Sequence, residues 1–303
     1  MNRSKKVACL AGDGVGPELM AEATRALMRV SQLHSLALED VHLPFAGEAV
    51  TRGGHPLPPA TRDGYKQADA VLVAAPHEPA LDGVKADLEL AVRLSRVHLR
   101  GGDVLVVGAV GPWADELAVE RAFTSAAARH GRLTSVGSSP AWRALVDTEQ
   151  SRWGGMTVEH LTPGEALVRL REAPLEVDVL VTESQLAAAV ADAAAHLAGS
   201  APAVAHAWLS ETGPGLFAPG MCDDAEVAGF GVADPTAMLL TTSLMLAEGL
   251  GRRSAARTLE RAVGAVAGLN GSRPTGTRPF TDAVLELLPE TRTDLELDAE
   301  GWR

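Results

Sequence analysis

The chain has 303 residues, enough for about two domains, and its 46% hydrophobic and 22% charged residues are typical of a globular protein rather than a disordered one. Because 27 Lys+Arg stand against 39 Asp+Glu, the net charge is −12, which argues against broad binding to nucleic-acid phosphates or anionic membranes. No apolar run approaches the roughly 20 residues of a membrane span, no signal-peptide pattern begins the chain, and Cys9 and Cys222 have no motif spacing, so we expect a reduced, cytoplasmic protein.

Short apolar runs alternate with longer amphipathic stretches, a pattern typical of an α/β protein whose helices cover a sheet. The predicted strands, in chain order, are 6–10, 70–74, 104–107 and 178–181. The predicted helices are 18–30, 185–197, 236–248, 259–269 and 281–288. Clusters of glycine and proline predict loops at 53–59, 213–215 and 271–274.

A glycine-rich turn lies between the first predicted strand and the first predicted helix. It contains Gly12, Asp13, Gly14 and Gly16. Glycines let the backbone turn tightly and approach a ligand closely, and N–H groups at a helix start favour an anion. The spacing differs from the dinucleotide-binding pattern of glycines at the first, third and sixth places. A plain strand-to-helix turn is the alternative interpretation.

Six segments in one order along the chain carry a more specific pattern. They are 10–18, 54–58, 68–72, 177–182, 213–219 and 227–237. Together these segments resemble the isocitrate/3-isopropylmalate dehydrogenase family of metal-dependent decarboxylating dehydrogenases. The resemblance implies a two-lobed α/β fold with a central cleft. It implies a cofactor-side lobe from residues 1–95 plus 226–303 and a substrate- and dimerisation-side lobe from 96–225.

That family oxidises a 2-hydroxy acid with NAD(P) and then decarboxylates it with the help of a divalent metal. The resemblance implies three aspartate ligands for Mg²⁺ or Mn²⁺. Two of these positions correspond here to Ala188 and Asp192, and the third to Gly164, with Glu165 as a neighbouring substitute. Asp192 is therefore either a residual metal ligand or a solvated helix residue. With one carboxylate retained, we do not expect a bound divalent metal.

The acid–base residues that the resemblance implies are also replaced. The family's tyrosine corresponds to Arg152, or to Trp153 if the register slips by one. Between 155 and 178 the chain is shorter than the family pattern, and this region should carry the catalytic lysine and the clasp between subunits. The chain's one tyrosine is Tyr65, and its lysines are Lys5, Lys6, Lys66 and Lys85. We therefore expect the usual lysine–tyrosine proton transfer to be lost.

Three arginines are the candidate substrate-binding residues: Arg93, Arg96 and Arg100. Arg100 resembles one of the family's substrate arginines. Spacings of three and four would place all three on one face of a helix, where guanidinium groups could clamp a carboxylate through two hydrogen bonds. The alternative is a solvated basic face opposite Asp87 and Glu89.

The candidate cofactor-binding residues are Gly12, Asp13, Gly14, Gly16, Glu226 and Asp234. The resemblance implies that Glu226 would bond ribose hydroxyls, favouring NAD over NADP, and that Asp234 replaces an amide near the adenine. Met221 stands where the family has an adenine-stacking histidine, and Asp223 and Asp224 add negative charge that repels a pyrophosphate. NAD is therefore a candidate cofactor with weakened binding.

These features predict an enzyme that acts on a small carboxylate or related anion by altered, metal-independent chemistry. Two alternatives stay open: a non-catalytic homologue, either a regulatory subunit or a ligand-binding protein, and an NAD-dependent 2-hydroxy acid oxidoreductase. Small apolar residues at 187–197 predict close helix packing in a homodimer, because the short region after Gly155 removes the clasp.

Overall fold

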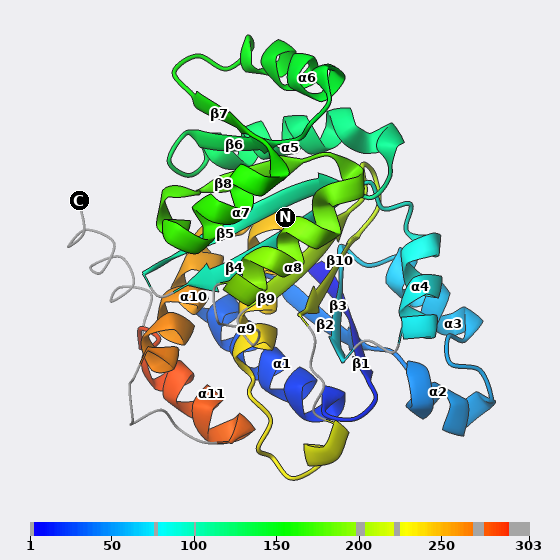
Figure 1. Ribbon diagram of the computed structural model, residues 1–303. Coiled ribbons are helices and arrows are strands. Elements are labelled where there is room, and N and C mark those ends of the chain that lie inside the picture. Colours follow the sequence, from blue (N-terminus) through cyan, green and yellow to red (C-terminus); the bar gives the residue numbers. More distant parts are fainter. Residues whose placement is uncertain are drawn as a thin grey trace. The chain divides into compact units, whose positions relative to one another are not determined.

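The computed structural model describes residues 3–75, 78–99, 101–197, 204–220, 225–268 and 276–290 (Figure 1). The chain divides into unit 1, Met1–Leu88 with Gly213–Arg303, and unit 2, Glu89–Thr212. Both borders lie earlier in the chain than the expected 95 and 225. The reason is that strand β4 (Val92–Leu99) pairs along its length with strands of unit 2, whereas β10 (Gly215–Pro219) pairs with a strand of unit 1.

Unit 1 contains four parallel strands in the order β2 (Leu38–His42), β1 (Lys5–Gly12), β3 (Ala70–Ala75) and β10. In β1 all four side chains from Val7 to Leu10 are buried. Since successive side chains point to opposite faces, both faces of this strand are covered. The predicted strands 6–10 and 70–74 are confirmed.

The helices of unit 1 are α1 (Gly16–Leu33), α2 (Ala46–Gly53), α3 (Pro59–Lys66), α4 (Glu78–Asp87), α9 (Thr236–Leu244), α10 (Arg253–Ala267) and α11 (Thr277–Glu286). α9 continues into a π-helical turn, Met245–Gly249. Every residue of α9 is buried, and α1 and α10 pack against it. The hydroxyls of Thr241 and Thr242 donate to carbonyls four residues earlier, so these buried polar groups are satisfied within the helix.

Unit 2 contains six strands in the order β9 (Val204–Leu209), β4, β5 (Gly102–Ala109), β8 (Val179–Thr182), β6 (Arg132–Val136) and β7 (Thr157–Leu161). β4 is antiparallel to both of its neighbours, and the pairs from β5 to β7 are parallel. The helices are α5 (Asp115–Ala127), α6 (Pro140–Gln150), α7 (Pro163–Glu172) and α8 (Ala187–Leu197).

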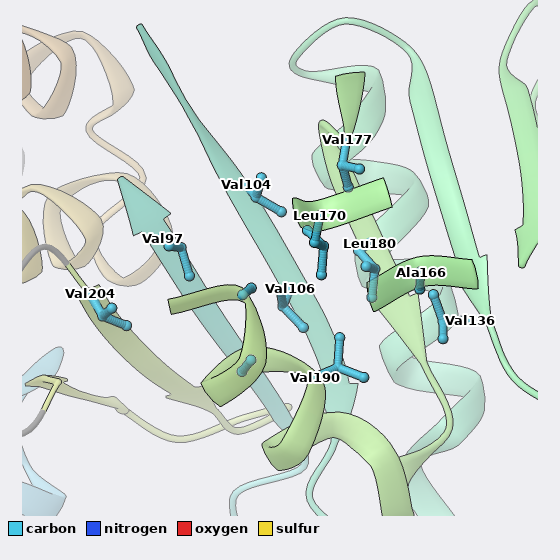
Figure 2. Packing of buried hydrophobic residues seen from close by; sticks show 12 residues of the cluster. Val97, Val104, Val106, Val136, Ala166, Leu170, Val177, Leu180, Val190 and Val204 are labelled. Atoms are coloured by element: carbon cyan, nitrogen blue, oxygen red, sulfur yellow. The ribbon is translucent and has the colours of Figure 1, made fainter. Parts of the chain in front are cut away.

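The core of unit 2 lies between α8 and the strands beneath it. Figure 2 shows Val190 of α8 next to Val106 of β5, with Val97 of β4 in the same cluster. α8 approaches β5 so closely that a Cβ added at Gly108 would lie 2.2 Å from the Cβ of Ala187. A glycine at 108 is therefore required by the packing of this helix.

One sequence-based expectation about unit 2 is wrong. Residues 92–99 form a strand, not a helix, so the arginines do not share a helical face. Residues 155–178 contain strand β7 and helix α7, and the expected loss of length here relative to the family stays a prediction. Among the small residues of α8, Ala187, Ala191 and Ala194 are buried within unit 2, whereas Ala188 and Ala189 are exposed, so helix packing between subunits also stays a prediction.

Within the described part of the chain, none of the helices combines the length and the hydropathy that crossing a membrane requires.

Candidate functional site

The glycine-rich turn of unit 1 is a junction between β1, α1 and α2. Gly12 and Gly14 adopt left-handed conformations, with φ of 76° and 60°, which favour glycine. The N–H of Gly16 donates to the carbonyl of Asp13 at 3.0 Å, and an Asp13 carboxylate oxygen accepts from the N–H of Gly47 at 2.7 Å. The turn therefore satisfies its own helix-start group and anchors α2. The cofactor roles of its residues stay predictions.

Glu18, in the first turn of α1, fixes the loop before α9. Its Oε2 accepts from the N–H of Gly231 at 3.1 Å. On the other side of the loop, the N–H of Thr277 donates to the Gly231 carbonyl at 2.8 Å, and its hydroxyl donates to the Ala233 carbonyl at 2.8 Å. Segments far apart in sequence thus hold this loop in one conformation, although Phe230 within it is 75% exposed.

The two acidic cofactor candidates of unit 1 have different surroundings. One oxygen of Asp234 accepts from the N–H and the hydroxyl of Thr236, at 2.9 and 2.6 Å, so Asp234 stabilises the start of α9. Glu226 is exposed in a 3₁₀ turn, Ala225–Val227. The loop residues Met221, Asp223 and Asp224 lie outside the described residues.

Arg96 points into a buried charge network of unit 2. Its Nε donates to Asp103 at 2.7 Å, and Arg129 donates to the same carboxylate at 2.9 and 3.1 Å. Arg129 also donates to Asp178 at 2.6 Å. Burial alone would raise the pKa of Asp103, but Arg96 and Arg129 hold that pKa well below its usual range. Arg96 therefore has a structural role that the sequence did not indicate.

Arg93 lies on the other face of β4, because its position differs from that of Arg96 by three, an odd number, and successive side chains of a strand point to opposite faces. Its guanidinium carbon lies 5.7 Å from the centre of the Trp208 ring, and Arg93 and Trp208 are paired directly across β4 and β9. The Nε of Arg93 is buried and has no hydrogen-bond partner within the described ranges. Burial lowers the pKa of Arg93, while the charge of Asp192 acts in the opposite direction. Arg100 lies outside the described residues.

The residues at the expected metal positions do not form a carboxylate cluster. Ala188 and Asp192 share the exposed face of α8. The Oε2 of Glu165 accepts from the N–H and the hydroxyl of Thr162, both at 2.8 Å, in a capping box that starts α7. In the described part of the chain, no three His, Cys, Asp or Glu side chains are placed to hold an ion together. The expectation that the protein holds no divalent metal stays a prediction.

The residues considered as acid–base candidates have structural contacts or lie in unit 1. The fully buried Tyr65 in unit 1 donates its hydroxyl to Asp87, which also accepts from Arg62 at 2.7 Å. The four lysines belong to unit 1, so the sequence of unit 2 has neither lysine nor tyrosine. At the position of the family's tyrosine, Arg152 pairs with Glu149 at 2.7 Å, and Trp153 stacks on a neighbouring phenylalanine.

Two features of unit 2 were missed in the sequence. Glu183, buried at the end of β8, accepts from the N–H of Ser138 at 3.2 Å and from the N–H and hydroxyl of Ser139 at 3.1 and 3.0 Å. Burial would raise the pKa of Glu183, but these hydrogen bonds hold it below its usual value. His206 and Trp208 were missed as well, although their alternation with alanines in the run VAHAWL indicates a strand with one polar face.

Among known protein families, one family model matches most of the chain. The family model for isocitrate/isopropylmalate dehydrogenase matches residues 6–98 and 115–273. Residues 99–114, which include β5, lie between the two matched segments, and residues 1–5 and 274–303 lie outside them. That the chain is shorter than the family pattern between 155 and 178 stays a prediction.

Individual relatives agree with the family model. A 3-isopropylmalate dehydrogenase of Synechococcus sp. (strain CC9605) is 33% identical over 322 residues, covering 86% of this chain and 90% of the relative. Among solved structures, a β-decarboxylating dehydrogenase from Thermococcus kodakarensis has a TM-score of 0.81 and 21% identity over 99% of both chains. An isocitrate dehydrogenase from Methylococcus capsulatus has a TM-score of 0.77 and 22% identity, covering 93% of this chain and 99% of that one. These structures share the α/β fold with this protein.

Proposed function

Since this chain belongs to the isocitrate/isopropylmalate dehydrogenase family, we propose that it acts on a small carboxylate or related anion bound by unit 2, through chemistry that needs no resident divalent metal. The observation that carries the proposal is Arg93. It is a half-buried guanidinium on the α8 side of β4, with a buried Nε that has no partner in the described segments. Such a group favours a bound anion.

The carboxylates around this site support the metal-independent part of the proposal. Asp192 has Ala188 one turn before it, so the exposed face of α8 has one carboxylate where a hard cation needs several oxygen ligands. Glu165 is held by Thr162 at the start of α7. If a proton is transferred, His206 is the candidate group, because an imidazole near neutral pH can both take up and release one.

A second candidate function is ligand binding without catalysis. It is favoured by the absence of lysine and tyrosine from the sequence of unit 2, because these are the residues that the family resemblance assigns to proton transfer. In this case the chain would be a regulatory or ligand-binding homologue, and Arg93 would hold the ligand without a reaction following.

A third candidate is an NAD-dependent 2-hydroxy acid oxidoreductase, which the names of the relatives favour. NAD would supply hydride acceptance, and Gly12, Gly14, Glu226 and Asp234 in unit 1 are the residues proposed to hold it. Asp13 and Asp234 each already accept hydrogen bonds from the protein, and Asp223 and Asp224 add negative charge that repels a diphosphate. This supports our expectation of weak NAD binding.

We also propose that the protein is a homodimer located in the cytoplasm. The contact would use the exposed small residues of α8, Ala188 and Ala189, because its other face is buried within unit 2. A strictly monomeric mass in light scattering at micromolar concentration would contradict the dimer.

A thermal-shift and native mass-spectrometry screen of the full chain separates these candidates. The ligands are NAD, NADP, Mg²⁺ and a set of 2-hydroxy diacids, and any hit is followed by a turnover assay with and without EDTA. We expect a carboxylate to bind and turnover to survive EDTA. Loss of turnover in EDTA, restored by Mg²⁺ or Mn²⁺, would return the protein to the metal-dependent class. Carboxylate binding with no turnover would favour the non-catalytic candidate.

A further inference from the structure

The face of β4 and β9 that packs against α8 changes from apolar to charged along the strands. The directly paired residues on this face are Val97 with Val204, Ser95 with His206, and Arg93 with Trp208. The valine pair belongs to the core beneath α8 (Figure 2). We call the other two pairs, Ser95 with His206 and Arg93 with Trp208, the Arg93–Trp208 row.

Contacts within the row hold each side chain in place. His206 Nδ1 lies 3.0 Å from Ser95 Oγ, and the His206 and Trp208 rings are 5.7 Å apart with an angle of 49° between their planes. The Arg93 guanidinium lies 5.7 Å from the Trp208 ring centre, within the range of a cation–π contact. Part of the entropy cost of ordering an arginine around a ligand is therefore met before the ligand arrives.

The charge of Arg93 is not neutralised by direct contact. Within the described residues, no ion pair to Arg93 is present, and its Nε has no hydrogen-bond partner. The carboxylate that acts on it electrostatically is Asp192, on the exposed face of α8. Two opposite charges thus lie on elements that contact each other, α8 and β4, with no ion pair between them among the described residues.

We propose that the Arg93–Trp208 row and Asp192 together bind a zwitterionic 2-amino acid, with its carboxylate on Arg93 and its ammonium group towards Asp192. This inference rests on the proposed function, because it names the ligand class of the same site. A ligand with only a carboxylate would pair with Arg93 and leave Asp192 without a partner, and one with only an amine would be repelled by Arg93. A 2-amino acid carries an ammonium group and a carboxylate on the same carbon atom and complements both residues, while Ser95 and His206 offer hydrogen bonds beside the carboxylate.

Four small probes with closely matched skeletons test the charge requirement: propanoate, L-lactate, L-alanine and isopropylamine. Each is titrated into the ¹⁵N-labelled full chain, and the indole N–H resonance of Trp208, assigned with Trp208→Phe, reports binding. We expect L-alanine to bind about fivefold more tightly than propanoate or L-lactate, the size of one exposed charge pair. Isopropylamine should not shift the resonance.

Variants assign each half of the ligand to its residue. Arg93→Gln should weaken the binding of both propanoate and L-alanine by roughly tenfold to a hundredfold, because it removes a charge-assisted hydrogen bond. Asp192→Asn should bring L-alanine to the affinity of propanoate without weakening propanoate. The matched controls are Glu120→Gln on α5 and Arg132→Gln on β6, two exposed residues of unit 2 outside the row, and both should leave all affinities unchanged.

The outcomes separate this inference from the function on which it rests. Equal affinities for propanoate and L-alanine, or equal affinities for L-lactate and L-alanine, would overturn the amino acid and leave a small-carboxylate site. A preference for L-alanine that persists in Asp192→Asn would overturn the assigned ammonium partner. No response of Trp208 to any carboxylate would overturn both the inference and the proposed site.

Discussion

Helix α7 of unit 2 and helix α2 of unit 1 both start with a backbone N–H bonded to a side-chain oxygen, but the oxygens come from different places. Thr162, directly before α7, forms a capping box with Glu165. Gly47, in the first turn of α2, donates to Asp13, which lies 34 positions earlier in the turn after β1. Through Asp13, the glycine-rich turn of unit 1 thus has a tertiary structural role.

The charge pairs of unit 1 are more exposed to solvent than those of unit 2. In unit 1, Asp69 pairs at 2.7 Å with Lys5, whose side chain is 40% exposed. In unit 2, Asp103 and Asp178 enclose Arg129, and the side chain of Asp178 is 2% exposed. Unpairing a charge should therefore cost far more in unit 2 than in unit 1, because the remaining partner cannot be solvated.

The largest effect is expected from Asp103→Ala, which removes the carboxylate shared by Arg96 and Arg129. The free energy of unfolding of unit 2 should fall by about 3–5 kcal/mol, the cost of leaving a buried charge without its partner. Urea unfolding followed by tryptophan fluorescence measures it, because four of the five tryptophans belong to unit 2. Asp69→Ala in unit 1, followed by circular dichroism, should cost about 1 kcal/mol. Equal costs would remove the contrast between the units.

The second largest loss of stability is expected from Gly108→Ala, because the added methyl group would overlap the Cβ of Ala187. Overpacking of this kind costs about 1–3 kcal/mol and should separate α8 from β5. The matched variant in unit 1 is Gly264→Ala in α10, where no atom lies within 4 Å of the added Cβ. It should stabilise by about 0.4–1 kcal/mol. Changes of the same sign at both glycines would show that the contact of α8 with β5 is less tight than the structure indicates.

The stability of unit 2 should depend on pH because of the buried His98 of β4. Burial and the neighbouring Arg96 lower the pKa of His98 to about 3, whereas the unfolded chain has a pKa of about 6.5. Between these values the unfolded state binds more protons, so the stability of unit 2 is full above pH 6.5 and declines as the pH falls towards 3. The slope should reach about 1.4 kcal/mol per pH unit.

Urea unfolding at several pH values between 4 and 7 measures this slope. His98→Gln should flatten it, and His196→Gln, at an exposed residue of α8, should not. A slope that His98→Gln leaves unchanged would assign the acid sensitivity to other groups.

The smallest effect is expected from the caps. Thr162→Ala should destabilise unit 2 by about 1 kcal/mol, because the first N–H groups of α7 lose their side-chain acceptor. Asp13→Ala should have a similar cost in unit 1 but should also loosen α2, since its anchor is not local. Amide hydrogen exchange of α2 and α7 compares them: we expect faster exchange in α2 for Asp13→Ala and no change there for Thr162→Ala. Unchanged exchange of α2 in Asp13→Ala would contradict the tertiary role of the turn.

The sequence by itself determined the fold class, the family and several buried elements. The runs at 6–10, 70–74 and 178–181 became strands because apolar residues dominate them and both faces of a central parallel strand are buried. The ordered segments from 10–18 to 227–237 indicated the family that the comparisons confirm. It also shows that residues 89–212, which the structure groups as unit 2, contain neither lysine nor tyrosine.

Only the tertiary structure decided which polar groups face each other. Arg93 and Arg96 fit a helix as well as a strand by spacing, and the pairing of β4 with β5 and β9 placed them on opposite faces. Arg96 donates a hydrogen bond to Asp103 in a buried network, and Arg93 lies over the ring of Trp208, which is more than a hundred residues later in the chain. The physical reason is that hydrophobic periodicity is local, whereas the partner of a charge is set by which strands become neighbours.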